Sequence, residues 1–98
     1  MSEASIQTEN SLAVNTPNLW TVTLLNDDFT PMDFVIEILT DIFRKSPEEA
    51  MEMTLSVHHE GRAVVGIYTK DIATTRVSRA IRLAEAEQHP LQLIAEAN

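Results

Sequence analysis

Polar side chains with binding chemistry gather in one short stretch, Asn26-Asp27-Asp28. An amide oxygen accepts hydrogen bonds and a carboxylate adds negative charge, so these side chains could bind a cationic ligand. Further along the chain, His58 is expected to share a helix face with apolar neighbours, where a histidine can be either an interior side chain or a ligand-binding one. Such residues also occur without any binding role, because Asx side chains bond their own backbone in turns. Both interpretations stay open at this point.

An enzyme is a second interpretation, with Asp27, Asp28 and His58 as a hydrolytic or metal centre. The sequence has no cysteine, no glycine-rich phosphate loop and no H-x-x-x-H spacing. His58 and His59 are adjacent, and neighbours on a helix point about 100 degrees apart, so they cannot easily share one metal ion. We therefore expect no enzyme activity, no metal and no cofactor.

The residues around this stretch predict a rigid corner between a strand and a helix. Residues 20–25 alternate apolar and polar side chains with β-branched enrichment, as a half-buried strand does. Thr30 and Asp33 have the spacing of a capping box, with Pro at the first helical position. Phe29 and Phe34 have the spacing of a hydrophobic staple. Two devices are thus expected to orient the helix that follows.

The remaining elements follow from apolar periodicity and turn residues. The first helix is expected to begin at Pro31, with its apolar stripe running from Phe34 to Phe43. Further helices are expected over residues 47–59 and 70–88, and further strands over 63–68 and 91–96. This order, β-α-α-β-α-β, predicts an α+β domain with three helices on one face of a small sheet.

Local signals refine these elements. Ser46 and Glu49 form a second capping-box pattern, Gly61 is expected to end the middle helix in the left-handed region, and Gly66 indicates a close approach or a bulge. Thr69 is the expected cap of the third helix. The residues expected to point inward from that helix are Ile72, Ala73, Val77, Ala80, Ile81 and Ala84.

Composition narrows the class of protein. Residues 1–18 are polar and aperiodic and are predicted to be a disordered extension, which leaves 19–98 as one core domain. The net charge of −8 opposes binding to nucleic acid or anionic membranes. No apolar run is long enough to span a membrane and no secretory signal is visible, so we expect a cytoplasmic protein. We also expect it to be a monomer.

Four runs of the sequence resemble the ClpS family, the adaptors of the ATP-dependent Clp protease. They are Asn26-Asp27-Asp28-Phe29-Thr30-Pro31-Met32-Asp33-Phe34-Val35, Val57-His58-His59-Glu60-Gly61-Arg62-Ala63, Gly66-Ile67-Tyr68-Thr69 and Glu87-Gln88-His89-Pro90-Leu91. The resemblance covers about residues 20 to 96. It implies a three-stranded antiparallel sheet and an N-terminal extension that helps to hand substrates to the unfoldase.

The resemblance also implies a binding site. The positions matching Asn26, Asp27 and His58 hold the free α-amine of a substrate's first residue, the aspartate through water. The matching side-chain pocket consists of Asp28 near its rim and of Thr30, Met32, Val35, Thr54, Val57 and Leu91. Thr54 stands where the family usually has methionine, which leaves the side-chain preference open while the amine site is intact.

The partners implied are proteins that begin with Phe, Tyr, Trp or Leu, and the N-terminal domain of a ClpA-type unfoldase. The family's docking positions for that domain match Asp71 and Arg76, whereas Arg79 and Arg82 have no assignment. The alternative is a ribosomal-stalk-like or scaffold domain of similar α+β shape that recognises no N-terminal residue, because fold alone does not imply function.

Overall fold

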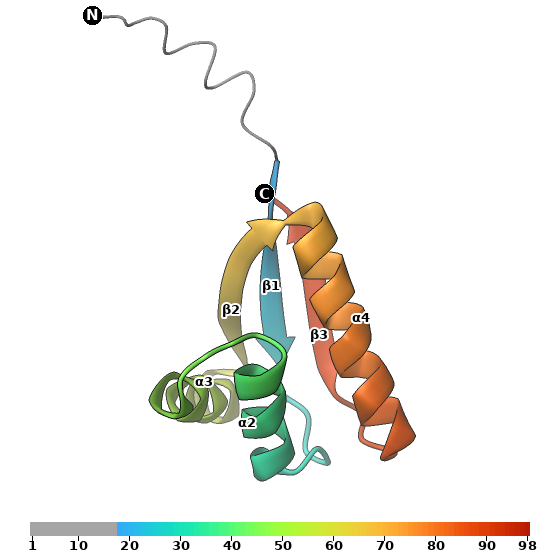
Figure 1. The fold of residues 1–98 in the computed structure, drawn as a ribbon. Coiled ribbons are helices and arrows are strands. Elements are labelled where there is room, and N and C mark those ends of the chain that lie inside the picture. The colour runs from blue at the N-terminus through green and yellow to red at the C-terminus, as the bar shows by residue number, and fades with distance from the viewer. Residues whose placement is uncertain (1–17) are drawn as a thin grey trace, which may run out of the picture.

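The computed structural model describes residues 18–98, and the expected extension of residues 1–18 falls outside them except for Asn18 (Figure 1). The elements in chain order are β1 (Leu19–Leu25), α2 (Met32–Asp41), α3 (Pro47–Glu60), β2 (Arg62–Thr69), α4 (Lys70–Ala86) and β3 (Gln92–Ala97). The predicted α+β class and the order β-α-α-β-α-β are therefore confirmed.

The strands form one antiparallel sheet in the order β2-β1-β3, so the first strand lies in the centre. Helix α4 runs along the sheet, and α2 and α3 lie together at the end where β1 finishes (Figure 1). The core lies between these layers. Its most buried large side chains are Leu39 from α2, Val22 from β1 and Val65 from β2.

Gly66 lies at a β-bulge and also in close contact with another part of the chain, and the sequence indicated one or the other. The pairing of β1 with β2 shifts between Val22, which faces Gly66, and Thr23, which faces Val64, so β2 carries a bulge there. A Cβ built on Gly66 would lie 2.7 Å from Cζ of Tyr68, closer than real Cβ atoms come to other heavy atoms. Glycine is therefore needed because the Tyr68 ring lies against the backbone.

Helix α3 begins and ends as its sequence predicts. The Ser46 hydroxyl accepts from the Glu49 N–H at 3.1 Å, and the Glu49 carboxylate accepts from the Ser46 N–H at 3.0 Å. At the other end Gly61 has φ of 90° and donates its N–H to the Val57 carbonyl. These local bonds satisfy backbone groups that the helix itself leaves free.

The predicted start of α2 is wrong. The N-cap residue is Pro31, no side chain caps the helix, and Asp33 accepts from the Phe34 N–H instead of pairing with Thr30. The expected staple is absent too, because Phe29 is 79% exposed. The Thr30 N–H, which a capping box would pair with Asp33, donates to the Asp27 side chain instead.

Helix α4 differs from the prediction at two positions. Thr69 is its N-cap but makes no side-chain capping bond. Ile72, expected inside, is 43% exposed, whereas Ala73, Ala80 and Ala84 are buried against the sheet. Small residues let the helix lie close to the strands, and this turns Ile72 to the flank of the helix.

Candidate functional site

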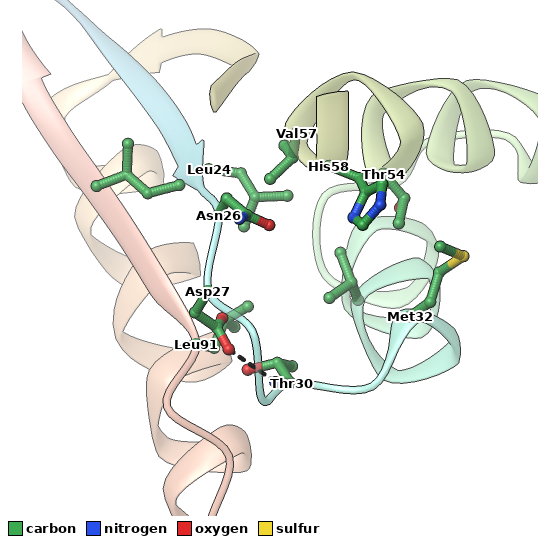
Figure 2. A pocket seen from close by; sticks show the side chains of 11 residues that line it. Leu24, Asn26, Asp27, Thr30, Met32, Thr54, Val57, His58 and Leu91 are labelled. Atoms are coloured by element: carbon green, nitrogen blue, oxygen red, sulfur yellow. Dashed lines mark hydrogen bonds between the residues drawn. The ribbon is translucent and has the colours of Figure 1, made fainter. Parts of the chain in front are cut away.

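A pocket opens where β1 ends, between the corner that follows it, the helices α2 and α3, and the start of β3 (Figure 2). Its free space is about 430 Å³, including the open mouth. The lining residues are Leu24, Leu25, Asn26, Asp27, Thr30, Met32, Val35, Thr54, Val57, His58 and Leu91. Acceptors and apolar side chains thus face one cavity.

The pocket lining includes every residue predicted for the amine site and the side-chain pocket except Asp28. Asp28 is exposed and lies in the bend over residues 28–30. Its expected place near the rim stays a prediction. Leu24 and Leu25 line the pocket but were missed, although their place at the end of a half-buried strand, directly before Asn26, was a usable signal.

A backbone hydrogen bond joins the two chain segments that carry the polar pocket residues Asn26 and His58. The Asn26 N–H donates to the Gly61 carbonyl at 3.0 Å, which ties the end of β1 to the end of α3. His58 lies in the last turn of α3, and this tie helps to bring it to the same pocket as Asn26 (Figure 2).

Asp27 shapes the corner. Its Oδ1 accepts from the Phe29 N–H at 2.9 Å and from the Thr30 N–H at 2.7 Å. The turn interpretation of this residue is thus correct for one carboxylate oxygen, while the other makes no hydrogen bond within residues 18–98. A single side chain can therefore hold the backbone and still present negative charge to the pocket.

His58 is exposed at the rim, and its ring stands at 72° to that of His59 with 5.5 Å between the ring centroids. Within residues 18–98 no three His, Cys, Asp or Glu side chains lie close enough to hold a metal ion. A neutral imidazole nitrogen here can act as a hydrogen-bond acceptor at the pocket mouth.

The apolar wall comes from α2, α3, β1 and the connection before β3. Val57 of α3, Leu24 of β1 and Leu91 are all buried, and Met32 lies 44% exposed at the mouth. Thr54 is buried and its hydroxyl donates to the Ala50 carbonyl at 2.7 Å. Because that hydroxyl already donates to the Ala50 carbonyl, Thr54 adds less polarity to the pocket wall than a threonine with a free hydroxyl would.

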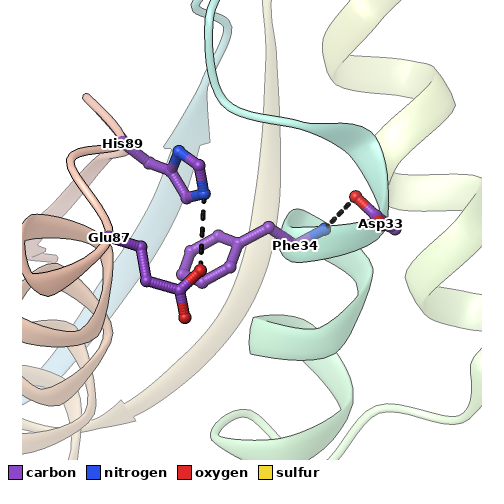
Figure 3. Close-up of polar contacts among 4 residues, drawn as sticks. All are labelled: Asp33, Phe34, Glu87 and His89. Atoms are coloured by element: carbon purple, nitrogen blue, oxygen red, sulfur yellow. Dashed lines mark hydrogen bonds and ion pairs between the residues drawn. The ribbon is translucent and has the colours of Figure 1, made fainter.

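Leu91 lines the pocket directly after the connection that follows α4. Figure 3 shows His89 of that connection beside Phe34 of α2. The His89 N–H donates to the Ala84 carbonyl at 2.8 Å, and its ring meets Phe34 edge-on with 4.7 Å between centroids. Glu87 lies 3.7 Å from the His89 ring nitrogen. The run from Glu87 to Leu91 therefore holds the start of β3 against α2.

Asp71 and Arg76, the expected docking residues, do not line this pocket. Both belong to α4, which begins at the end of the sheet opposite to the pocket (Figure 1). Asp71 is exposed, and Arg76 lies over the Tyr68 ring with 5.2 Å from Cζ to the ring centroid.

Comparison with known proteins points in one direction. Residues 15–94 match the family described as ATP-dependent Clp protease adaptor protein ClpS. A ClpS adapter protein of Deinococcus radiodurans is 45% identical over 97% of this chain and 84% of its own length. One from Neisseria gonorrhoeae is 52% identical over 82% of this chain and 77% of its own length.

A solved structure agrees with the sequence comparisons. Agrobacterium tumefaciens ClpS2, solved bound to L-phenylalaninamide, matches with a TM-score of 0.81 at 36% identity, covering 85% of this chain and 100% of that one.

Among the helices of residues 18–98, none has the length and apolar character that a membrane span requires.

Proposed function

Because the chain belongs to the ClpS family, whose members are adaptors of the Clp protease and not enzymes, we propose that its pocket binds the free N-terminus of substrate proteins. The preferred first residues are Phe, Tyr, Trp and Leu. The protein acts as a cytoplasmic monomer that delivers these substrates to a ClpA-type unfoldase.

The observation that carries this proposal is the meeting of hydrogen-bond acceptors and an apolar wall in one small pocket. Asn26, Asp27 and His58 present acceptors and charge at the mouth, as an ammonium group with its three donors requires. Val57 and Leu91 line the interior beside them. An amine joined to a bulky side chain is the ligand that satisfies both halves.

The solved relative supports the same ligand class. Phenylalaninamide, to which Agrobacterium tumefaciens ClpS2 was bound, carries a free α-amine next to an aromatic side chain. In this chain Asn26 and His58 would accept from the amine, and Asp27 would add its charge through water. The aspartate then avoids a fully buried ion pair, whose desolvation would offset much of its attraction.

The expected affinity for a peptide N-terminus follows from the contacts that the pocket offers. Burying a Leu or Phe side chain stabilises the complex by about 1.5 to 3 kcal/mol. Each charge-assisted hydrogen bond adds about 1.5 to 3 kcal/mol. After the cost of association, an affinity on the order of micromolar remains, so a substrate can be held and then released to the unfoldase.

Delivery uses a second surface. We assign Asp71 and Arg76 of α4 to docking on the N-terminal domain of the unfoldase, and the N-terminal extension, residues 1–18, to the hand-over of substrate. Since α4 begins far from the pocket, substrate and unfoldase can be bound together (Figure 1).

The test is a binding scan over all twenty N-terminal residues in an otherwise fixed peptide, measured by fluorescence anisotropy. We expect Phe, Tyr, Trp and Leu to bind and N-terminal acetylation to abolish binding. In a parallel arm, Asn26→Ala should remove binding, while Arg82→Ala on α4 serves as a control outside the pocket. Indifference to the first residue would overturn the proposal and favour a scaffold domain.

A further inference from the structure

The sheet has one face covered by α4 and another that carries exposed apolar side chains. Trp20 of β1 points to the covered face, where Nζ of Lys70 lies 5.6 Å from the centroid of its ring. On the other face, Val64 and Ile67 of β2 are each 55% exposed, and Ile94 of β3 is 37% exposed. We call these three side chains the open face, because no element of residues 18–98 covers them.

Strand register places the three side chains on one side of the sheet. Thr23 of β1 pairs with both Val64 and Ile94, and Thr21 pairs with Ile67. Partners on neighbouring strands point to the same side of a sheet, and so do residues two apart along one strand. Both threonines alternate with side chains of β1 that lie in the core, so the open face is the one turned away from α4.

The chain enters the sheet at the open face. Leu19, the first residue of β1, is two positions from Thr21, so its exposed side chain points to the same side. Residues 1–17 precede it and lie outside the described part of the chain. A segment tethered here has an effective concentration at the open face on the order of millimolar. The protein's own N-terminal extension is therefore favoured over a second copy as the occupant of this face.

The residues just before β1 favour a reversal of the chain. Pro17 and Asn18 have the residue types preferred at the two central positions of a β-turn. Both edges of β1 are already paired, with β2 and β3, and α4 covers one face of the sheet (Figure 1). A chain that turns back at Pro17 and Asn18 therefore meets the open face.

The apolar residues of the extension have the spacing that the open face requires. Counted back from such a turn, Val14 comes level with Thr21, and Leu12 comes level with Thr23. In an extended segment, residues two apart point to the same side, so both apolar side chains can face the sheet. Residues 10–18 include no charged side chain, and their burial therefore desolvates no charge.

We propose that residues 10–17 dock on the open face of their own domain, with Leu12 and Val14 over its apolar side chains. Docking holds the extension on the domain until the unfoldase takes hold of it, a role that rests on the hand-over function proposed above. It also covers apolar surface that would otherwise promote contacts between chains.

The first test attaches a spin label to the extension of the full chain and measures methyl signals by NMR. The sequence has no cysteine, so Ser11→Cys provides a single attachment site beside Leu12. The label should strongly broaden the signals of Val64 and Ile94 on the open face. The signal of Leu83, which is exposed on α4, should broaden much less. Equal broadening on both sides of the domain would overturn the proposal.

A mixed sample distinguishes docking within one chain from docking between chains. It combines a spin-labelled chain without isotope labels and an isotope-labelled chain without the spin label. We expect no broadening in this sample. Broadening of the open-face signals here would show that the extension reaches a second copy, and docking on its own domain would be rejected.

Substitutions test the apolar contact itself. The double variant Leu12→Asp/Val14→Asp should reduce the broadening at Val64 at least roughly fivefold, because apolar burial is replaced by charge. Ile6→Asp is the matched control, since it adds a charge to the same extension outside the docked segment, and it should leave the broadening unchanged. Ile67→Thr keeps a strand-favouring residue on the open face and should reduce the broadening roughly twofold. Unchanged broadening in the double variant would overturn the proposal.

Peptide binding and delivery keep this proposal apart from the function proposed above. The pocket opens where β1 ends, so affinity for a Phe-starting peptide should be unchanged in Leu12→Asp/Val14→Asp. If docking is absent but deletion of residues 1–17 still abolishes delivery, only the docking is wrong. If docking is observed but the deletion leaves delivery unchanged, the docking stands and the hand-over role is wrong.

Discussion

Helices α2 and α3 are packed against each other, and their N-terminal ends satisfy the backbone in different ways. At α3, Ser46 and Glu49 bond each other's N–H groups. At α2 the cap is Pro31, which has no capping side chain, and the Thr30 hydroxyl beside it is buried without a hydrogen-bond partner in the part of the chain that the structure describes. One helix start is locally complete and the other is not.

The incomplete start is the one that borders the pocket. Thr30 and Met32 both line it, whereas no residue of the α3 capping box does. Buried polar groups without partners cost stability, and they persist mainly where a binding site needs them. The contrast indicates that the capped start of α3 stabilises the fold, whereas the uncapped start of α2 forms part of the binding pocket. Variants at the two helix starts should therefore change different properties.

Among the variants that test this division, the largest effect is expected for Asp27, which both holds the corner and adds charge to the pocket. Asp27→Ala removes the acceptor used by the Phe29 and Thr30 N–H groups. It should weaken binding of a Phe-starting peptide by roughly 30- to 100-fold, because charge and corner geometry are lost together. Asp27→Asn keeps an acceptor for the turn and should lose only roughly three- to tenfold. Equal losses in anisotropy measurements would show that the turn is irrelevant to binding.

Thr54 should change selectivity more than affinity. Thr54→Met adds a longer, flexible side chain to the wall, which a short Leu ligand can contact, so affinity for Leu relative to Phe should rise roughly five- to tenfold. Thr54→Val removes the hydroxyl that bonds the Ala50 carbonyl at nearly constant volume. That control should leave the ratio nearly unchanged, and an unchanged ratio in Thr54→Met would remove Thr54 as a determinant.

At the capped helix the expected change is in stability alone. Ser46→Ala deletes the hydroxyl that accepts from the Glu49 N–H and should lower the free energy of unfolding by about 1 kcal/mol. Urea denaturation measures this loss. Peptide affinity measured on the same variant should not change, and a clear decrease would contradict the division between the two helix starts.

The smallest effect concerns pH. The Ser46 N–H, and secondarily its hydroxyl, lower the pKa of Glu49 below its usual value. A carboxyl with a lowered folded-state pKa adds stability above its unfolded-state pKa and loses it as the pH falls through the folded-state value. The midpoint difference between the natural protein and Glu49→Gln in thermal unfolding should therefore shrink between neutral pH and about pH 3. A difference that grows on acidification would reverse the assignment.

Interactions between residues close in the sequence determined where several helices and strands begin and end. The strand ending at Leu25, the capping box of Ser46 and Glu49, and the left-handed Gly61 depend on bonds within a few residues, so pattern predicts them. The start of α2 shows the limit of such patterns. There two local motifs competed for one backbone corner, and the bonds of Asp27 prevailed over the expected box of Thr30 and Asp33.

The tertiary structure alone decided which distant residues meet. The bond from Asn26 to Gly61 places His58 at the pocket, and the contact of His89 with Phe34 holds the chain where Leu91 completes the wall. Packing also decided that alanines of α4 face the sheet while Ile72 does not. Such contacts depend on how whole elements pack against one another, and the neighbours of a residue in the sequence do not specify that packing.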